Sequence, residues 1–304
     1  MHPTSALARL QQFTTLGLLA GAAGWLLWHW PQSPVLAVAG GAVIVLGYAA
    51  FLAAEFVALS FVGSHEPDER PGALELARAW LGEVRTAPAV FCWRQPFRWR
   101  AIPDRLDGPE LAGRRGVVLI HGFVCNRGFW TPWLRILQSR GHAFAAVNLE
   151  PVFGSIEDYV PIIDQAVEAV TRATGLPPVL VCHSMGGLAA RAWLRTRQAD
   201  DRVAHVITIG TPHRGTWLGQ FSHLRNGSQM RLQSEWLGEL ALYATETRHA
   251  CFTCWYSNCD NIVFPVRTAT LPGADNRLVR GVAHVDLAFA DEVIEGTLAK
   301  IAAL

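Results

Sequence analysis

The sequence of 304 residues lacks several features that would place it in a simple class. It has no excess of positive or negative charge: 26 basic and 25 acidic residues leave a net charge of +1. We therefore expect no nucleic-acid-binding surface. Lysine occurs once, as Lys300, and the other basic residues are arginines. We interpret this as the amino-acid usage of the source organism and not as a sign of a binding site. The chain shows no internal repeat and no low-complexity tract, which speaks against a repeat protein.

Cysteine is too sparse and too scattered for a disulfide scaffold. Cys251 and Cys254 are spaced like half of a zinc site, but no second Cys or His pair has a matching spacing. We therefore expect buried, reduced thiols, and neither a metal nor an organic cofactor. The six cysteines are Cys92, Cys125, Cys182, Cys251, Cys254 and Cys259.

Charged residues are also scarce near the start of the chain, where hydrophobic residues concentrate. Two uncharged, mostly apolar runs, 13–30 and 35–54, are separated by a short turn at 31–34. Because about 20 apolar residues span a bilayer, both runs are long enough to cross it. Residues 1–63 are therefore predicted to form a membrane anchor of two transmembrane helices, with Trp25, Trp28 and Trp30 near one interface.

The alternative for the first run is a cleaved signal peptide, with Ala37-Val38-Ala39 as the candidate cleavage site. Cleavage there would cut into the second apolar run, so we favour the hairpin. Glu55 lies near the end of the second run, where its carboxylate can reach the membrane interface. We interpret Glu55 as a residue without a special role.

The next segment, 64–115, is predicted to hold an amphipathic helix and a connector. A charged stretch from His65 to Arg70 marks the boundary with the anchor. Apolar residues then recur with helical spacing over 73–84, which predicts a helix lying on the membrane surface or on the following domain. A looser alternation over 89–100 predicts an edge strand.

From 116 to 304, short apolar runs alternate with helical patterns. This arrangement predicts an α/β fold with a mostly parallel, doubly wound sheet. The predicted strands cover 116–120, 143–147, 179–182, 203–209, 251–256 and 277–282, and predicted helices cover 156–174 and the C-terminal segment to 303.

One stretch in this domain carries a chemical signature. The strand at 179–182 is followed by His183-Ser184-Met185-Gly186-Gly187 and then by helical spacing. A strand, a sharp turn with a central serine and a helix form the context of a nucleophile elbow, in which the neighbours of the serine must be small. Gly186 meets this need. Cys182 replaces the usual glycine on the strand side, and we interpret it as a buried packing residue.

The stretch resembles the serine hydrolases of the α/β-hydrolase fold, and among them the bacterial lipases and esterases. The resemblance covers 116–304 and rests on His121-Gly122-Phe123, the elbow, and the run Gly210-Thr211-Pro212-His213-Arg214-Gly215. It implies a helical lid at about 215–250. It also implies an oxyanion hole formed by the backbone N–H groups of Phe123 and Met185.

A serine nucleophile needs a histidine base and a carboxylate that orients it, and in this fold the chain order is serine, acid, histidine. Asp260 follows the strand at 251–256, and His284 follows the last strand. Because parallel strands bring their carboxyl ends to one edge of the sheet, we expect Ser184, Asp260 and His284 to meet there.

Other acids and histidines are less suitable as the orienting carboxylate or the base. Asp286 is two residues from His284, too close to orient that ring, and Asp275 is interpreted as a surface residue. None of the remaining candidate histidines follows the last strand. We interpret these as structural: His121, His183 and His213.

These residues predict a membrane-anchored serine hydrolase that cleaves carboxylic esters, lipid acyl esters in particular, through an acyl-enzyme. The apolar insertion is expected to bind the acyl chain, because such sites bind by apolar burial; the alternative is an ordinary packed subdomain. The candidate substrate-binding residues are Trp217, Phe221, Trp236 and Leu240.

Two other functions stay open: an acyltransferase or thioesterase with the same triad, and a catalytically silent membrane-bound binding protein on this fold. The expected partners are an acyl ester or lipid substrate and the bilayer, with no nucleic acid and no evident protein partner.

The resemblance to bacterial enzymes implies the inner membrane. Arg9 precedes the first apolar run, and Arg70 and Arg78 follow the second. Positively charged flanks favour the cytoplasm, so the N-terminus and the hydrolase domain are both expected there. The scattered cysteines fit a reducing compartment.

Overall fold

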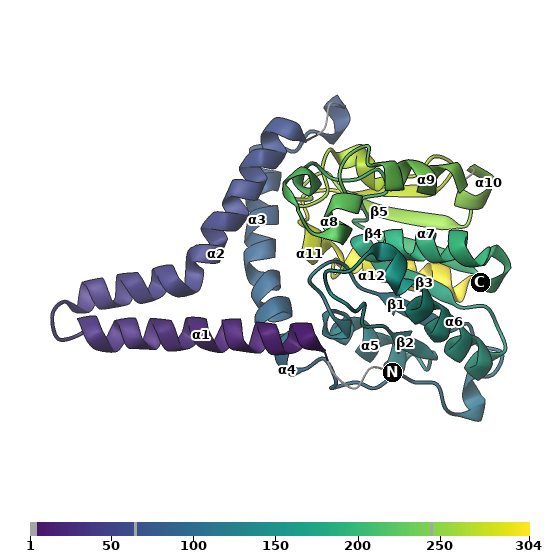
Figure 1. Ribbon diagram of the computed structural model, residues 1–304, viewed down its shortest axis with the longest axis horizontal. Helices are drawn as coiled ribbons and strands as arrows, with labels where there is room; N and C mark the ends of the chain where they lie inside the picture. The colour runs from purple at the N-terminus through teal and green to yellow at the C-terminus, as the bar shows by residue number, and fades with distance from the viewer. Residues whose placement is uncertain (1–4, 64–65, 244–245) are drawn as a thin grey trace.

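The computed structural model describes residues 5–63, 66–243 and 246–304. At its centre lies a sheet of six parallel strands in the order β2-β1-β3-β4-β5-β6 (Figure 1). The predicted α/β fold with a doubly wound, mostly parallel sheet is confirmed. The strands are β1 Val117–Ile120, β2 Phe144–Ala146, β3 Val179–His183, β4 His205–Ile209, β5 Phe252–Ser257 and β6 Asp275–Val279.

Helices cover both faces of this sheet, which is why the central strands are continuous apolar runs. Alternate residues of β1 and β3 point to opposite faces: Val118 and Leu180 to one core, Val117 and Val181 to the other. The first face is covered by α6 (Val160–Thr174), α7 (Met185–Arg197) and α9 (Glu235–Tyr243). The second is covered by α5 (Thr131–Ser139), α11 (His284–Leu287) and α12 (Asp291–Ala302).

The two apolar runs at the start of the chain form a helical hairpin that projects from the α/β unit, residues 116–304 (Figure 1). Its helices are α1 (Ala6–His29) and α2 (Pro34–Val62). Each begins at a serine, Ser5 or Ser33, whose hydroxyl accepts a backbone hydrogen bond of the first turn. The C-terminal half of α2 bends away from α1 and runs beside α3 (Ala73–Pro88) (Figure 1).

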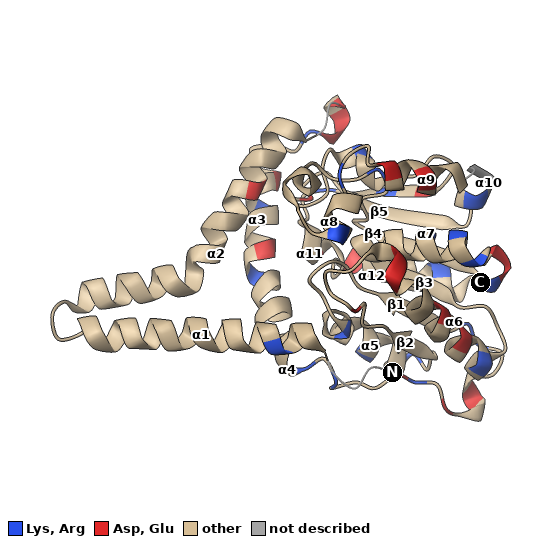
Figure 2. Ribbon diagram, in the orientation of Figure 1, with Lys and Arg blue, Asp and Glu red and all other residues tan. Residues whose placement is uncertain are grey.

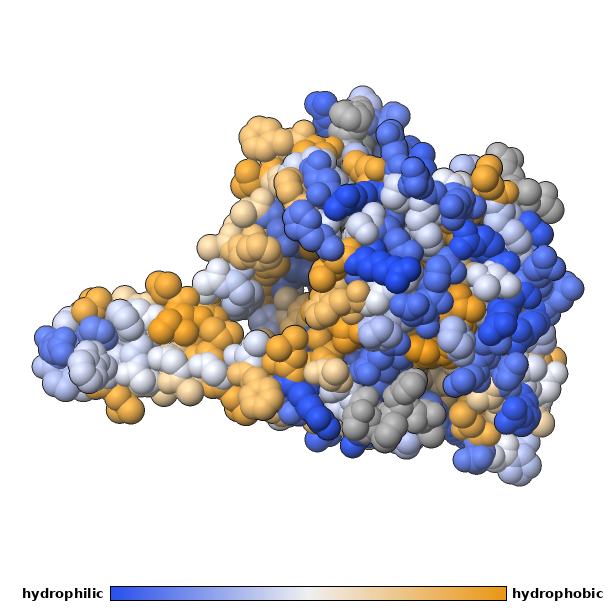
Figure 3. All heavy atoms as spheres, viewed as in Figure 1, coloured by the Kyte–Doolittle hydropathy of each residue, from blue (hydrophilic) through white to orange (hydrophobic). Residues whose placement is uncertain are grey.

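Among the described helices, only α2 is both long enough and apolar enough to cross a membrane. The helix α1 falls short because its glutamines, threonines and glycines make it less apolar. The hairpin nevertheless exposes large apolar side chains, with Phe13 77% and Leu27 78% exposed on α1, and Val43 70% and Phe61 85% exposed on α2. Figure 3 shows this apolar surface, and Figure 2 shows that charges gather elsewhere. Apolar surface of this extent marks an interaction site.

The helix α3 lies between α2 and the α/β unit. The Tyr48 hydroxyl of α2 donates to the Val84 carbonyl at 2.8 Å, and the Trp80 indole N–H donates to the Ala49 carbonyl at 2.9 Å. The edge strand predicted at 89–100 is wrong. Residues 89–97 are helical, as η2 (Ala89–Arg94) and α4 (Gln95–Phe97): Val90 is fully buried in the core on the second face of the sheet, and Pro96 fits the first turn of α4.

The insertion at 215–250 connects β4 to β5, and its described residues, which leave out 244–245, include four helices. It holds η7 (Trp217–Phe221), α8 (Arg225–Gln229), α9 and α10 (Glu246–His249). Residues 64–65, at the start of the predicted segment 64–115, lie outside the described residues. The remaining short helices are η1 Pro67–Glu69, η3 Pro109–Leu111, η4 Arg127–Trp130, η5 Ile156–Tyr159, η6 Asp200–Arg202 and η8 Val266–Ala269.

Candidate active site

Ser184 lies in a sharp turn between β3 and α7. Its backbone has φ 53° and ψ −129°, a conformation that residues with a side chain rarely adopt. The Ser184 N–H donates to the Ile209 carbonyl at 2.9 Å, and the Thr211 hydroxyl donates to the Ser184 carbonyl at 2.8 Å. The neighbouring strand β4 and the turn after it therefore hold this strained backbone in place.

Small residues surround the turn, as the elbow pattern requires. A Cβ at Gly122 would lie 2.7 Å from the Cβ of Ser184, and a Cβ at Gly186 would strike the carbonyl oxygen of Ile120. Cys182 is fully buried in β3, and burial raises the pKa of its thiol far above its usual range. Cys182 is thus a neutral core residue at the position where the elbow usually has glycine.

Asp260 and His284 form a buried pair. The His284 Nδ1–H donates to Asp260 Oδ2 at 2.9 Å. The other oxygen, Oδ1, accepts from the backbone N–H groups of Ile262 at 2.9 Å and Val263 at 2.7 Å, which fixes the carboxylate. This arrangement selects the tautomer of His284 whose Nε2 is free to accept a proton.

The Asp260–His284 pair lies against the strand end that holds Ser184. A Cβ at Gly210 would lie 3.0 Å from Asp260 Oδ2 and 3.2 Å from His284 Nδ1, and the residue before Gly210 accepts the hydrogen bond of Ser184. The rings of His183 and His284 are 4.7 Å apart, and His183 Nε2–H donates to the His284 carbonyl at 3.1 Å. The structure thus brings the three predicted residues to one edge of the sheet.

The charge balance around His284 favours its protonated form. Burial lowers the pKa of His284, but the carboxylate of Asp260, joined by those of Glu83 and Glu55, outweighs burial and raises the pKa above its usual value. An imidazolium at this position is therefore stabilised, as a general base requires after it takes a proton.

The other histidines of the site behave differently. Burial lowers the pKa of His121 to about 4, and it lowers the pKa values of His183 and His213 well below their usual range. His121 Nε2 accepts from the Leu149 N–H at 3.0 Å, and the carbonyl of His213 accepts from Arg191 at 3.0 Å. Their contacts fit the structural roles expected for them.

The rival acids have other partners. Asp286 Oδ1 accepts from the Thr86 hydroxyl of α3 at 2.7 Å, and Asp275 pairs with Arg277 at 2.7 Å near the surface. Only Asp260, of the three acids considered, contacts the His284 ring in the described structure.

The loop after β1 lies beside the elbow. Phe123 follows Gly122, which contacts the Ser184 turn, and the Phe123 ring meets the Phe153 ring edge-on with centroids 6.0 Å apart. Met185 is the first residue of α7 and is buried. The two predicted oxyanion-hole residues therefore lie close to Ser184: Met185 directly follows it in the chain, and Phe123 follows Gly122, which contacts it.

The four residues expected to bind an acyl chain occupy two different places. The Trp217 ring meets the Phe221 ring edge-on, with centroids 4.8 Å apart, and stacks on the Phe264 ring, with centroids 5.8 Å apart. Phe264 packs in one cluster with Cys259 and Ala283, the residues directly before Asp260 and His284. Trp217 and Phe221 therefore lie on the same side of the molecule as His284.

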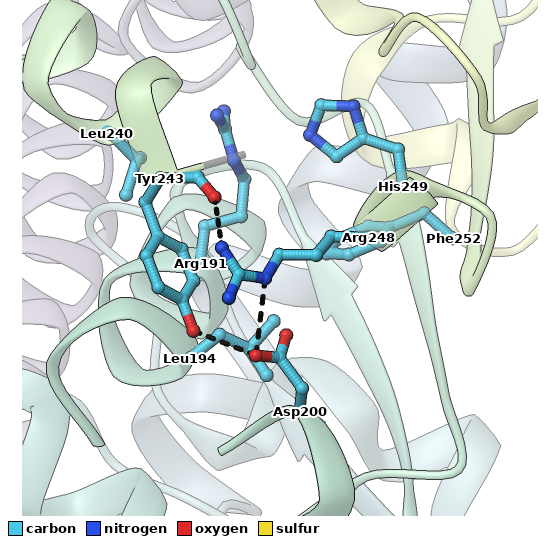
Figure 4. A pocket seen from close by; sticks show the side chains of 8 residues that line it. All are labelled: Arg191, Leu194, Asp200, Leu240, Tyr243, Arg248, His249 and Phe252. Atoms are coloured by element: carbon cyan, nitrogen blue, oxygen red, sulfur yellow. Dashed lines mark hydrogen bonds and ion pairs between the residues drawn. The ribbon is translucent and has the colours of Figure 1, made fainter. Parts of the chain in front are cut away.

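Trp236 and Leu240 lie elsewhere. The Trp236 indole N–H donates to Glu157 at 2.8 Å. Leu240 lies beside Leu194 and Asp200 in a small pocket (Figure 4). Leu194 is ten residues beyond Ser184 on α7, about 15 Å away at 1.5 Å per residue. Trp236 and Leu240 therefore pack near the C-terminal end of α7, away from Ser184. These contacts lend no support to the prediction that both bind an acyl chain.

Three residues near His284 were missed by the sequence analysis. Asn261 Oδ1 accepts from the His284 N–H at 3.1 Å, and the carboxylate of Glu83 accepts from the two N–H groups that follow. Glu55, interpreted as a residue without a special role, accepts from the amide of Asn261 at 2.6 Å. Asn261 was detectable as the neighbour of Asp260, but the two glutamates lie about 200 positions from their partners.

Comparison with known proteins places this arrangement in a family. The model of the alpha/beta hydrolase family matches residues 117–294, more than half of the chain. The chain therefore belongs to the alpha/beta hydrolase family. It is similar to triacylglycerol lipases of Pseudarthrobacter phenanthrenivorans and Burkholderia plantarii, each 34% identical over 123 residues. These matches cover 36% of this chain, and the chain spans about a third of the length of the curated relatives, 37% and 33%.

Solved structures share the fold. A lipase of Bacillus licheniformis in its mature form superposes with a TM-score of 0.53 and 15% identity, covering 62% of this chain and 92% of that one. Lipase B of Aspergillus fumigatus superposes with a TM-score of 0.51 and 17% identity, covering 60% and 51%. At this level of identity the likeness shows the fold alone.

Proposed function

We propose that the protein is a membrane-anchored serine hydrolase that cleaves carboxylic esters, with lipid acyl esters as its substrate class. The observation that carries the proposal is the buried Asp260–His284 pair, with its 2.9 Å hydrogen bond, beside a serine in a strained turn. The similarity to triacylglycerol lipases over 123 residues supports ester chemistry.

In the proposed reaction, Ser184 Oγ attacks the ester carbonyl carbon while His284 Nε2 takes the hydroxyl proton. The N–H groups of Phe123 and Met185 stabilise the oxyanion. When the tetrahedral intermediate collapses, the C–O bond breaks, His284 returns the proton to the alcohol and an acyl-enzyme remains. Water then attacks the acyl carbon, with His284 again as the base, and releases the carboxylic acid and free Ser184.

The proposed acyl-binding surface is the aromatic side of the site formed by Trp217, Phe221 and Phe264. The exposed Phe221 ring and the partly exposed Trp217 ring, packed over the buried Phe264, offer apolar burial to a hydrocarbon chain, as small-molecule sites do. This surface belongs to η7, the first helix of the insertion at 215–250, so the proposed lid is its N-terminal part rather than α9.

The proposed anchor is the hairpin of α1 and α2. The exposed apolar side chains of both helices and the span-length helix α2 support it. We place the anchor in a bacterial inner membrane with the hydrolase domain in the cytoplasm, on the basis of Arg9 near the start of α1 and Arg70 after the end of α2.

Labelling with a fluorophosphonate probe tests the nucleophile. The wild-type protein should be labelled and should hydrolyse p-nitrophenyl esters, whereas Ser184→Ala should do neither and keep its melting temperature. The matched control Ser139→Ala, at an exposed serine of α5, should behave like the wild type. Retained labelling of Ser184→Ala would overturn the proposal.

A further inference from the structure

Two glutamates from the N-terminal helices reach the loop that carries His284. Glu83 of α3 is only 2% exposed, and its carboxylate accepts from the backbone N–H of Val285 at 3.2 Å and of Asp286 at 3.1 Å. These are the two residues directly after His284. Burying a carboxylate costs free energy unless hydrogen bonds compensate for the lost water, and these two backbone N–H groups provide that compensation for Glu83.

The second contact comes from α2. Glu55 Oε2 accepts from the side-chain amide of Asn261 at 2.6 Å, and Asn261 Oδ1 accepts from the backbone N–H of His284 at 3.1 Å. Asn261 is fully buried and directly follows Asp260. A chain of two hydrogen bonds therefore joins the helix of the proposed anchor to the backbone of His284.

Further bonds from α3 hold the same two loops. Thr86 donates to Asp286 Oδ1 at 2.7 Å. Glu75 accepts from the amide of Asn258 at 3.3 Å, and Asn258 Oδ1 accepts from the backbone N–H of Gly281 at 2.9 Å. The loops that carry Asp260 and His284 are thus bonded to helices that lie outside the α/β unit.

We propose that Glu83 and Glu55 are positioning residues for His284, so that the N-terminal helices complete the active site in addition to anchoring it. The inference rests on the proposed function in one respect: it takes His284 as the general base. Among the described residues, neither glutamate hydrogen-bonds the imidazole ring; each acts through the backbone of 284–286. A displaced loop would move Nε2 away from Ser184, and a misplacement of about 1 Å can cost roughly a hundredfold in rate.

The electrostatics of the site fit this role. Asp260 faces His284 from the loop after β5, Glu83 from α3, Glu55 from α2 and His183 from the end of β3. Asp286 lies on the same short helix and bonds Thr86. Burial raises the pKa of Glu83 to about 7, against the lowering effect of His284 and the two N–H donors. The carboxylates stabilise the imidazolium, so removing one of them lowers the pKa of His284.

The test uses the full-length protein with the variant Glu83→Gln. We expect kcat for a p-nitrophenyl ester to fall roughly ten- to a hundredfold with little change in KM. The acid limb of the pH profile of kcat/KM should move to lower pH, because the negative charge that raised the pKa of His284 is gone. A purely structural role would lower the amount of folded enzyme without moving the pH profile. Glu295→Gln, at an exposed glutamate of α12, is the matched control.

Hydrogen exchange measured by mass spectrometry gives a readout that does not depend on activity. The peptide containing 284–287 should exchange faster in Glu83→Gln than in the wild type or in Glu295→Gln. Glu55→Ala, which removes the contact with Asn261, should also speed this exchange and lower kcat, and it carries the test if Glu83→Gln does not fold.

The outcomes separate the two proposals. Unchanged exchange, kcat and pH profile in both glutamate variants would overturn the positioning role, while ester hydrolysis by the wild type and its loss in Ser184→Ala would leave the proposed function standing. A wild-type protein without esterase activity or labelling would overturn the proposed function, and faster exchange in the variants would then still support the positioning contacts.

Discussion

Single carboxylates near His284 differ in what they bond. Asp260 accepts the hydrogen bond of the ring, whereas Asp286, only two residues from His284, accepts one from Thr86 of α3. The two acids are close to the same histidine but have different hydrogen-bond partners. We therefore expect substitutions of Asp260 and Asp286 to reduce activity by different amounts.

Asp260→Asn should lower kcat by about 10⁴-fold, the cost of the equivalent change in a serine protease triad, because the amide no longer selects the correct tautomer. Asp286→Asn should have a much smaller effect, since Asp286 bonds α3. Steady-state kinetics with p-nitrophenyl butyrate and melting temperatures of both variants measure the ranking. If Asp286→Asn were the more damaging of the two, Asp260 would not be the orienting acid.

Residues of the site differ in how far the sequence alone predicted them. The placement of Ser184, Asp260 and His284 at one edge of the sheet was predictable, because each follows a strand and parallel strands bring their carboxyl ends together. Glu83 was not predictable: its partners are backbone N–H groups 202 and 203 positions away, and a backbone donor has no signature in the sequence. Glu55 was misjudged, because an acid near the end of an apolar run also suits a membrane interface.

Among the elements, the strands of the sheet were the most predictable, since buried parallel strands are short continuous apolar runs. The segment 89–100 was mistaken for a strand because its loose alternation also fits a helix with one buried side, on which Val90 is fully buried. The insertion at 215–250 was expected to act as one lid. Its apolar residues instead serve two purposes, since those of η7 lie near His284 and Leu240 of α9 fills the core.

This division predicts different results for two double variants. Trp217→Ala with Phe221→Ala should weaken hydrolysis of long-chain esters more than of acetate esters, because each buried methylene contributes about 0.8 kcal/mol. Trp236→Ala with Leu240→Ala should instead lower the melting temperature, since a buried leucine truncated to alanine costs about 2–5 kcal/mol of stability.

A chain-length series of p-nitrophenyl esters and thermal unfolding of both double variants provide the comparison. Equal losses at all chain lengths for the Trp217 and Phe221 pair would remove η7 from the acyl site. A chain-length effect confined to the Trp236 and Leu240 pair would restore α9 as the lid.

At the scale of the whole molecule, the hairpin proposed as an anchor predicts how the protein is oriented relative to a membrane. The turn between α1 and α2 carries no charge, whereas Arg9 lies near the start of α1 and Arg70 follows the end of α2. Two spans return the chain to the side where it began, and positive flanks favour the cytoplasm.

Reporters fused at Leu304 measure this orientation. A fluorescent protein that folds only in the cytoplasm should glow, and an alkaline phosphatase fusion should stay inactive. An active phosphatase fusion would place the hydrolase domain on the outer side of the membrane and leave α2 as a single span.

The contact between α2 and the Asn261 loop also bears on how the proposed enzyme meets its substrate. An active site bonded to the anchor helix stays at a fixed height beside the lipid surface, and the esters it reaches diffuse in two dimensions. Tethering replaces bulk concentration by an effective local one. The turnover of such an enzyme follows the mole fraction of ester in the bilayer, and inert lipid added to the vesicles slows it by surface dilution even when the total amount of ester is unchanged.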